Sequence, residues 1–160
     1  MVFSIDSTSS SIDKIKLKKG NGHYPYITRS KINNGIESFI LSQELYSIDC
    51  GNCITIGLDT QTVFYQSNEF YTGQNIQILR NKEMNEWNAQ FLIPLLHNTL
   101  GGLFWGGNGA TLTRLKRSKI MLPVDENEKP DWPYMEQYVK INECKLIKNY
   151  ISEMKSSCRV

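Results

Sequence analysis

The chain has 160 residues, of which 40% are hydrophobic and 21% charged, a composition that fits one globular domain and excludes a largely disordered chain. Its formal net charge of +2 at pH 7 is too small to indicate nucleic-acid binding by itself. The longest apolar runs, such as residues 91–96, are far shorter than a membrane span, and the serine-rich start lacks the apolar stretch of a signal peptide, so we expect a cytoplasmic protein.

The first half of the chain has the pattern of a β-rich domain. Residues 1–13 are rich in serine and lack periodicity, which leaves a flexible lead-in and an early strand as alternatives. Residues 23–32 predict a strand and residues 33–35 a turn, because Asn and Gly accept positive φ at low cost. Clusters of Gly, Asp, Ser and Asn separate further predicted strands at residues 53–56, 62–66 and 75–79.

The spacing of apolar residues changes after residue 80. Intervals of three and four predict an amphipathic helix packed on the sheet, through Met84, Trp87, Phe91, Leu95 and Leu96. Gly101-Gly102 should end this helix, and Pro94 should kink or shorten it because proline removes a backbone hydrogen bond. Residues 112–124 return to a strand-like pattern interleaved with basic residues.

A long helix is predicted from Asp131, with Asp131 or Trp132 at the cap and Pro133 tolerated in the first turn. Running to about residue 154, it would span roughly 35 Å, more than a domain of this size can cover. Trp132, Met135 and Val139 can fold back on the domain. The distal half should dock on another chain or segment through Leu146, Ile147, Tyr150, Ile151 and Met154.

Charge is segregated along the chain. Basic residues without an intervening acid form two clusters, namely Arg114, Lys116, Arg117 and Lys119, and Lys14, Lys16, Lys18 and Lys19. Such a distribution suits a one-faced binding surface, although a solvated strand with lysines on its outer face has the same pattern.

Two chemical motifs point to no catalytic or metal site. Cys50 and Cys53 form a C-x-x-C pair, but Cys144 and Cys158 follow about ninety residues later without pair spacing, so we expect reduced thiols rather than a zinc or redox site. Residues 130–131 and 143–145 satisfy the loose P-D…E-x-K spelling of metal-dependent nucleases. Both halves lie on the predicted helix, roughly 18 Å apart, too far to share a metal ion.

A glycine-rich loop and its surroundings resemble a known family. Residues 104–113 and 117–124, with the loop Gly106-Gly107-Asn108-Gly109, resemble the end of a target recognition domain in the specificity subunits of type I restriction-modification systems. Earlier segments at residues 24–35, 53–57 and 70–76 resemble its opening and middle strands, and residues 130–135 resemble the helix start of related fused enzymes. All lie in the order of the family.

The resemblance implies an α+β fold, with a twisted or barrel-like sheet, one packed helix and a long C-terminal helix. Residues 14–130 would form the DNA target recognition domain and residues 131–160 a helix for dimerisation or partner docking. The chain has room for one such domain where a full subunit has two, so it would be a half-subunit that dimerises, a domain of a fused enzyme or a fragment. Its partners would be double-stranded DNA, a methyltransferase subunit or a second copy. S-adenosylmethionine and Mg²⁺ would belong to partner subunits, with no cofactor, metal or catalytic residue here.

The resemblance also implies roles for individual residues. Polar side chains would read base edges, since Arg pairs with guanine and Asn or Gln with adenine, and the candidates are Arg29, Asn33, Asn34, Gln66, Asn68 and Asn108. The glycine loop and basic run would contact phosphates, through Gly107, Thr111, Arg114, Lys116 and Arg117. For each, a turn-forming or solvated polar residue is the alternative.

A second function class would give the aromatic residues a different role. In a β-barrel that binds single-stranded nucleic acid or sugars, four aromatic side chains would be exposed stacking platforms: Tyr65, Tyr71, Phe104 and Trp105. Burial of these side chains would argue against it.

Overall fold

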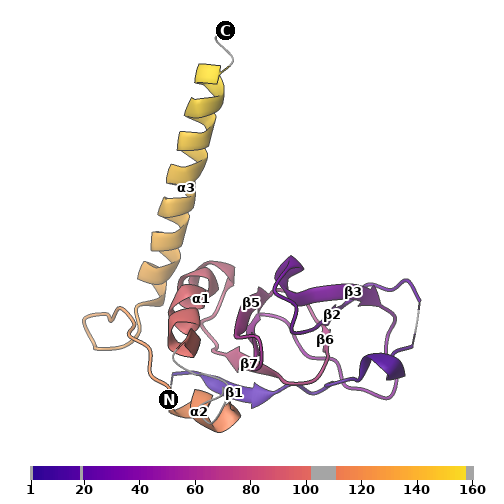
Figure 1. Cartoon of the computed structure of the whole chain (residues 1–160). Coiled ribbons are helices and arrows are strands. Elements are labelled where there is room, and N and C mark those ends of the chain that lie inside the picture. The colour runs from indigo at the N-terminus through magenta and orange to yellow at the C-terminus, as the bar shows by residue number, and fades with distance from the viewer. Residues whose placement is uncertain (1, 19, 102–110, 158–160) are drawn as a thin grey trace.

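The computed structural model describes residues 2–18, 20–101 and 111–157. In these ranges the strands form two open sheets (Figure 1). The first sheet is antiparallel with the order β1-β7-β4-β5, and its strands are β1 (Ser4–Ser7), β4 (Cys53–Gly57), β5 (Thr62–Gln66) and β7 (Ile76–Arg80). The second has the order β3-β2-β6, with β2 (Tyr24–Ile27), β3 (Ile36–Ile40) and β6 (Tyr71–Thr72).

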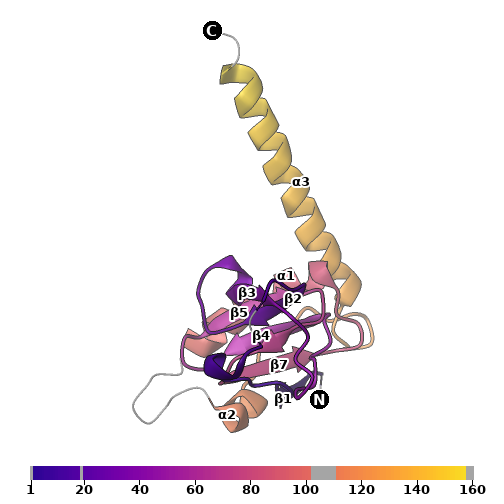
Figure 2. The ribbon, with the colours of Figure 1, turned by 90° about the vertical axis from the view of Figure 1, so that its right-hand side faces the viewer.

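The helices lie around these sheets, and the longest leaves them altogether. Figure 2 shows α3 (Trp132–Ser157) projecting from one side of the molecule while α1 (Glu86–Gly101) crosses the first sheet. Shorter elements are the 3₁₀ turns η1 (Lys14–Lys16) and η2 (Asn33–Gly35) and the helix α2 (Leu112–Arg117) beside β1.

The first sheet is covered on both faces, which explains why every residue of β4 is buried. On one face Ile54 and Ile56 pack with Leu92 of α1, and Met135 of α3 joins the same cluster. On the other face, Cys53 packs with residues that include Ile27 of the second sheet. The layers are therefore helix, sheet and sheet. The expected α+β fold, with a packed helix and a long C-terminal helix, is confirmed, and its strands form two open sheets rather than a closed barrel, held face to face by these apolar contacts.

The predicted strands and turn are largely confirmed. The expected strands at 53–56, 62–66 and 75–79 correspond to β4, β5 and β7, and η2 lies at the expected turn, with positive φ at Asn33, Asn34 and Gly35. Of the two alternatives for the first thirteen residues, the structure has the strand, because β1 pairs with β7. β3 was not predicted, and β6 lies within residues 70–76, which the family resemblance assigns to a strand.

The helix predicted after residue 80 is confirmed as α1, but its buried stripe differs from the expected one. Ala89, Leu92, Leu96 and Leu100 are buried, whereas Trp87, Phe91 and Leu95 are only half-buried. Pro94 lies inside the sixteen-residue helix, so it does not shorten it. Pro94 and Gln90, whose carbonyl lacks the usual N–H partner because of the proline, are both exposed, so water can satisfy that carbonyl.

The strand predicted at residues 112–124 is wrong, because residues 112–117 form α2 and residues 118–123 are irregular. Thr111 caps the helix, with its Oγ1 accepting a hydrogen bond from the backbone N–H of Arg114 at 3.3 Å. Leu112 and Leu115 lie three residues apart on one face, and Leu115 is buried in the main core. The three-residue spacing of Leu112 and Leu115 is typical of a helix, but a six-residue segment is too short for this spacing to distinguish a helix from a strand.

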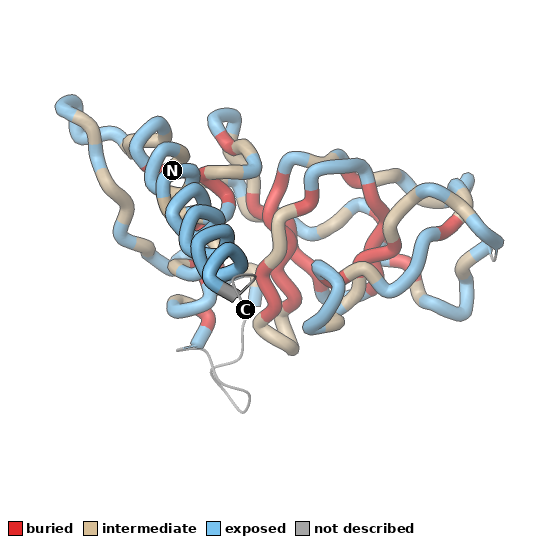
Figure 3. The backbone as a smooth tube through the Cα atoms, turned by 90° about the horizontal axis from the view of Figure 1, so that it is seen from above, coloured by how far each residue is buried: buried red, intermediate tan, exposed pale blue. Residues whose placement is uncertain are grey.

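The long helix is confirmed as α3, and its two halves differ in environment. Asp131 caps it, accepting a hydrogen bond from the Tyr134 N–H at 2.9 Å. In the proximal half Met135 is fully buried and the Trp132 ring meets Phe3 edge-on at 5.9 Å. Figure 3 shows the distal half exposed on all sides. Within the described residues, no helix is both long and apolar enough to cross a membrane.

Candidate functional site

Three loops that are distant in sequence meet at one end of the two sheets. β2 and β6 run parallel and end together, with the Gly73 N–H donating to the Ile27 carbonyl at 2.8 Å. The end of β4 lies opposite the start of β7, and the Leu58 N–H donates to the Asn75 carbonyl at 3.1 Å. We call residues 28–30, 57–62 and 73–75 together the three-loop end.

An ion pair and a hydrogen bond connect these loops through their side chains. Arg29 Nη1 pairs with Asp59 Oδ2, and Asn75 Nδ2 donates to the same oxygen at 3.1 Å. Gly57 makes room for this arrangement, because a Cβ there would overlap the hydroxyls of Thr60 and Thr62 and would lie 3.6 Å from Arg29 Cγ. The Arg29 side chain is 43% exposed, so its guanidinium is both anchored and accessible.

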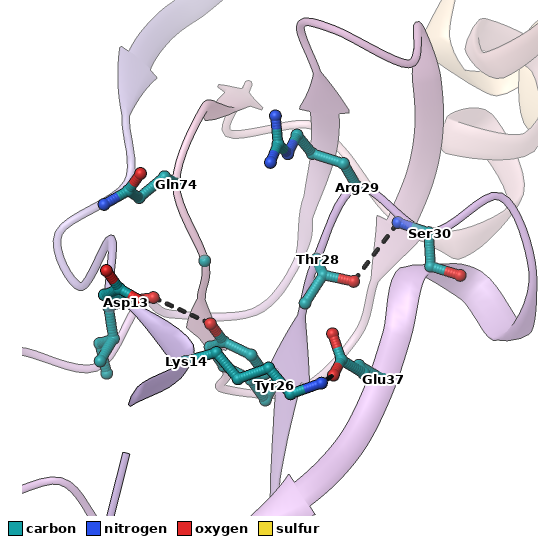
Figure 4. Close-up of a pocket in the computed structure, with 10 residues that line it drawn as sticks. Asp13, Lys14, Tyr26, Thr28, Arg29, Ser30, Glu37 and Gln74 are labelled. Atoms are coloured by element: carbon teal, nitrogen blue, oxygen red, sulfur yellow. Dashed lines mark hydrogen bonds and ion pairs between the residues drawn. The ribbon is translucent and has the colours of Figure 1, made fainter. Parts of the chain in front are cut away.

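A polar pocket of about 360 Å³ lies beside this ion pair and brings in the N-terminal segment. Figure 4 shows Arg29 and Gln74 on one side of the pocket and the ion pair between Lys14 and Glu37 on another. At its base, the Tyr26 hydroxyl donates to the Ile12 carbonyl at 2.8 Å. Burial, with smaller effects of the Glu37 and Asp13 charges, raises the pKa of Tyr26 to about 12. Tyr26 is therefore a neutral hydrogen-bond donor at physiological pH.

Two of the expected base-reading residues have structural roles. Gln66 is only 4% exposed, and its Nε2 donates to the Asn34 carbonyl at 3.0 Å and to Thr55 Oγ1 at 3.1 Å. Asn34 Nδ2 donates to the Tyr65 carbonyl at 2.8 Å. These bonds hold η2 against β5, so the expectation that Gln66 reads bases is corrected, and Asn34 primarily fixes the turn.

The remaining candidates are spread over the surface. Arg29, Asn33 and Asn68 are exposed, but only Arg29 belongs to the three-loop end. Thr111 is the N-cap of α2, described above. Gly107 and Asn108, with the rest of the glycine loop, lie outside the described residues.

The basic residues of α2 lie on a helix anchored to the protein body. Leu115 is buried, and Lys116 Nζ lies 3.2 Å from Asp6 Oδ1 on β1. Asp6 pairs with Ile78, which is three residues along β7 from Asn75, or roughly 10 Å at the rise of a strand. Arg117 is exposed and Arg114 half-buried. Lys116 therefore reaches the strand pair β1–β7, whose far end leads into the three-loop end, although α2 follows all three loops in the sequence.

The aromatic residues of the stacking hypothesis do not form an exposed platform. Tyr71 is only 3% exposed, and its hydroxyl accepts from the Gln43 N–H at 3.1 Å. Tyr65 is half-buried and donates to Asn52 Oδ1 at 2.9 Å. Phe104 and Trp105 lie outside the described residues. Burial of Tyr71, together with the open sheets, contradicts the stacking barrel.

The cysteines and acids show no metal arrangement among the described residues. Cys50, Cys53 and Cys144 are free thiols, and Cys158 lies outside the described residues. Burial raises the pKa of Cys53 to about 12, which makes its thiol a poor nucleophile. Asp131 caps α3 and Glu143 lies within the same helix, so the predicted placement of both on one helix is confirmed.

Sequence reasoning missed several residues at the three-loop end. The sequence pattern gives Asp59 only a turn role, places Gln74 and Asn75 in a strand-like segment, and makes Lys14 part of a basic cluster, so none of the four is predicted as a site residue. Positive φ at Gln61 and Asn75 marks tight turns, which the Asp, Asn and Gly residues of these loops indicate in the sequence. No local pattern, however, predicts that Arg29 meets Asp59.

Comparison with known proteins identifies what this chain is similar to. The family model described as Type I restriction modification DNA specificity domain matches residues 2–153. A curated protein, the Type II restriction enzyme BgcI specificity subunit S.BcgI of Heyndrickxia coagulans, is 33% identical over 132 residues, which are 81% of this chain and 38% of that protein. This chain therefore spans less than half the length of that relative.

A solved structure shows the same fold at low sequence identity. A chain from a study described as "Structural basis underlying complex assembly and conformational transition of the type I R-M system" gives a TM-score of 0.60 at 15% identity, over 98% of this chain and 40% of that one. The HsdS subunit from Thermoanaerobacter tengcongensis gives a TM-score of 0.49 at 14% identity, over 98% and 37%.

Proposed function

The chain belongs to the family of type I restriction modification DNA specificity domains, and on this premise we propose that it reads a double-stranded DNA sequence through its three-loop end. It is the DNA specificity module of a restriction-modification system. Methyl transfer and any cleavage belong to partner subunits, which bring S-adenosylmethionine and Mg²⁺.

One observation carries the proposed location of the reading surface. The three-loop end presents the exposed side chains of Arg29 and Gln74, which come from two of its loops, next to buried strands. Arg and amide side chains are the groups that form bidentate hydrogen bonds with guanine and adenine. Loops held by a rigid sheet can keep such groups in register with a groove.

Helix α2 would supply phosphate contacts beside this surface. Arg114, Lys116 and Arg117 lie within one turn of a helix that Leu115 anchors in the core. The exposed pair between Lys116 and Asp6 is worth at most about 1 kcal/mol, so a phosphate can replace the carboxylate. Phosphate contacts would set the position of the domain on the duplex while the loops read bases.

The distal half of α3 would dock on a helix of another chain. Five large side chains there are 45% to 70% exposed: Leu146, Ile147, Tyr150, Ile151 and Met154. Burying each would stabilise a complex by up to about 1.5 to 3 kcal/mol. A second copy would give a two-fold dimer that reads a palindromic or split site, and a methyltransferase subunit would give the working enzyme.

Selection from a random duplex pool tests the proposed function. The chain, alone and with its methyltransferase subunit, is incubated with random duplexes at moderate salt, and the bound fraction is sequenced after several rounds. We expect one enriched motif with defined positions. If no motif were enriched, by the chain alone or with its methyltransferase subunit, sequence-specific recognition would be contradicted. If the bound DNA were recovered only as single strands, a single-stranded ligand would be favoured.

A further inference from the structure

We propose that Asp59 is a positioning residue for DNA recognition, which holds the Arg29 guanidinium in the orientation that reads one guanine. The inference rests on the proposed function and extends it to a residue outside the predicted set. Asp59 lies in the turn between β4 and β5, thirty positions from Arg29 in the sequence.

In the Arg29 side chain, one part of the guanidinium is anchored by Asp59 and the other part is available to contact a base. A guanidinium has five N–H donors in a planar fork, and the ion pair with Asp59 engages Nη1. The other donors are left for the O6 and N7 acceptors of guanine in the major groove. Because one edge of the guanidinium is already anchored, the Arg29 side chain loses less rotamer entropy when it binds a base.

Asp59 is itself held in place. Its Oδ2 accepts from Asn75 Nδ2 at 3.1 Å, and its side chain is 27% exposed, less than that of Arg29. The backbone bond from Leu58 to Asn75 joins the same two loops. Asp59 is thus fixed from the β6–β7 side while Arg29 approaches from the β2 side, and the pair joins all three loops.

An alternative explanation is that the ion pair only stabilises the loops. Exposed pairs contribute little to stability, typically about 0.2 to 1 kcal/mol, and Lys18 with Glu44 forms another such pair at 3.0 Å near the opposite end of β2. A stabilising role would lower affinity for all duplexes equally. A positioning role would change the discrimination at one base pair.

The test measures binding to the selected duplex and to every single-base-pair variant of it. The proteins are wild type, Arg29→Lys, Asp59→Asn, the double variant, and Glu44→Gln as a control that removes one negative charge from a more exposed ion pair outside the three-loop end. Arg29→Lys and Asp59→Asn should each lose about 5- to 150-fold of the discrimination at the same G·C position, the range of a good bidentate contact. The double variant should lose no more than Arg29→Lys alone, and Glu44→Gln should keep full discrimination.

Further outcomes decide between the two explanations. Asn75→Ala, which removes the support of Asp59, should cause a smaller loss at the same position. Uniform weakening across all duplexes, or additive losses in the double variant, would overturn the positioning role, even with the selected motif intact. If wild type selects no motif, the proposed function fails, and the role of Asp59 fails with it.

Discussion

At the residue scale, a buried carboxylate secures the N-terminal segment. Asp49 is only 4% exposed and accepts hydrogen bonds from the Ser9 N–H at 2.8 Å, the Ser10 N–H at 3.3 Å and the Ser10 hydroxyl at 2.9 Å. Ser10 Oγ accepts from the Thr72 N–H at 2.8 Å. Asp49 therefore helps to fix the segment that carries Lys14 to the pocket, together with the bond from the Tyr26 hydroxyl to the Ile12 carbonyl.

We expect Asp49→Ala to lower the free energy of unfolding by about 1 to 3 kcal/mol for each buried donor left without a partner. Urea denaturation followed by tryptophan fluorescence measures the change. Glu69→Ala removes a nearby exposed acid and should change stability by no more than about 0.5 kcal/mol. Equal effects of the two substitutions would show that the hydrogen bonds to Asp49 contribute nothing specific.

At the element scale, α2 combines a buried anchor with an exposed basic surface. Leu115 holds it to the core, so its basic residues can be replaced without removing the packing that keeps the helix in place. Arg114 is half-buried, and Lys116 and Arg117 are exposed. These features allow the phosphate role of the helix to be tested separately from its folding.

Replacing Arg114, Lys116 and Arg117 by Ala should weaken binding to all duplexes about equally. Removal of three phosphate contacts should make the slope of log affinity against log salt shallower by about 3, because each contact releases counterions. Fluorescence anisotropy over a salt series measures both effects. Ala at Lys145, Lys148 and Lys155 removes the same charge from α3 and should leave the slope unchanged; an equal change there would mean that only net charge matters.

The junction of α1 and α3 explains how the long helix is oriented. Glu136 accepts hydrogen bonds from Lys140 at 2.5 Å and from Asn85 Nδ2 at 2.7 Å, and these bonds lower the pKa of Glu136. Phe91 of α1 meets Tyr138 edge-on at 5.5 Å. Beyond this junction α3 has exposed residues and no strand or helix of the described chain beside it (Figures 1 and 3).

At the scale of the whole molecule, the proposed reading surface and the proposed docking half of α3 lie on different parts of the chain. Twenty-six helical residues span roughly 39 Å, most of it beyond the domain. Such an element would set the distance between this domain and a second body. Substitutions on its distal half should therefore affect assembly and leave the structure of the reading surface intact.

Ile147→Asp combined with Ile151→Asp should abolish self-association or methyltransferase binding, because two carboxylates would be buried in an apolar helix interface. Sedimentation equilibrium measures the first and pull-down of the methyltransferase subunit the second. Asn149→Asp with Ser152→Asp places the same charges on the opposite face of the helix and should preserve both. The docking role would be abandoned if wild type stayed monomeric at high concentration and the first double variant still bound the methyltransferase.

Sequence alone determined much of the local structure. β4, β5 and β7, the turn at η2, and the helices α1 and α3 were predicted because each depends on a pattern within a few residues of the chain. The order of its motifs also indicated the family. The role of Asp131 as the cap of α3 followed from the same kind of local chemistry.

Only the tertiary structure decided which distant residues meet. Pairing of β1 with β7 and of β2 with β6 depends on packing between layers, and a two-residue strand such as β6 has no period of its own. The six residues of α2 were too few to separate a helical from an alternating pattern. Arg29 and Asp59 are adjacent because the register of the strands brings their loops to the same end of the two sheets. Register depends on pairing between strands that are distant in the sequence, so no short stretch of sequence predicts it.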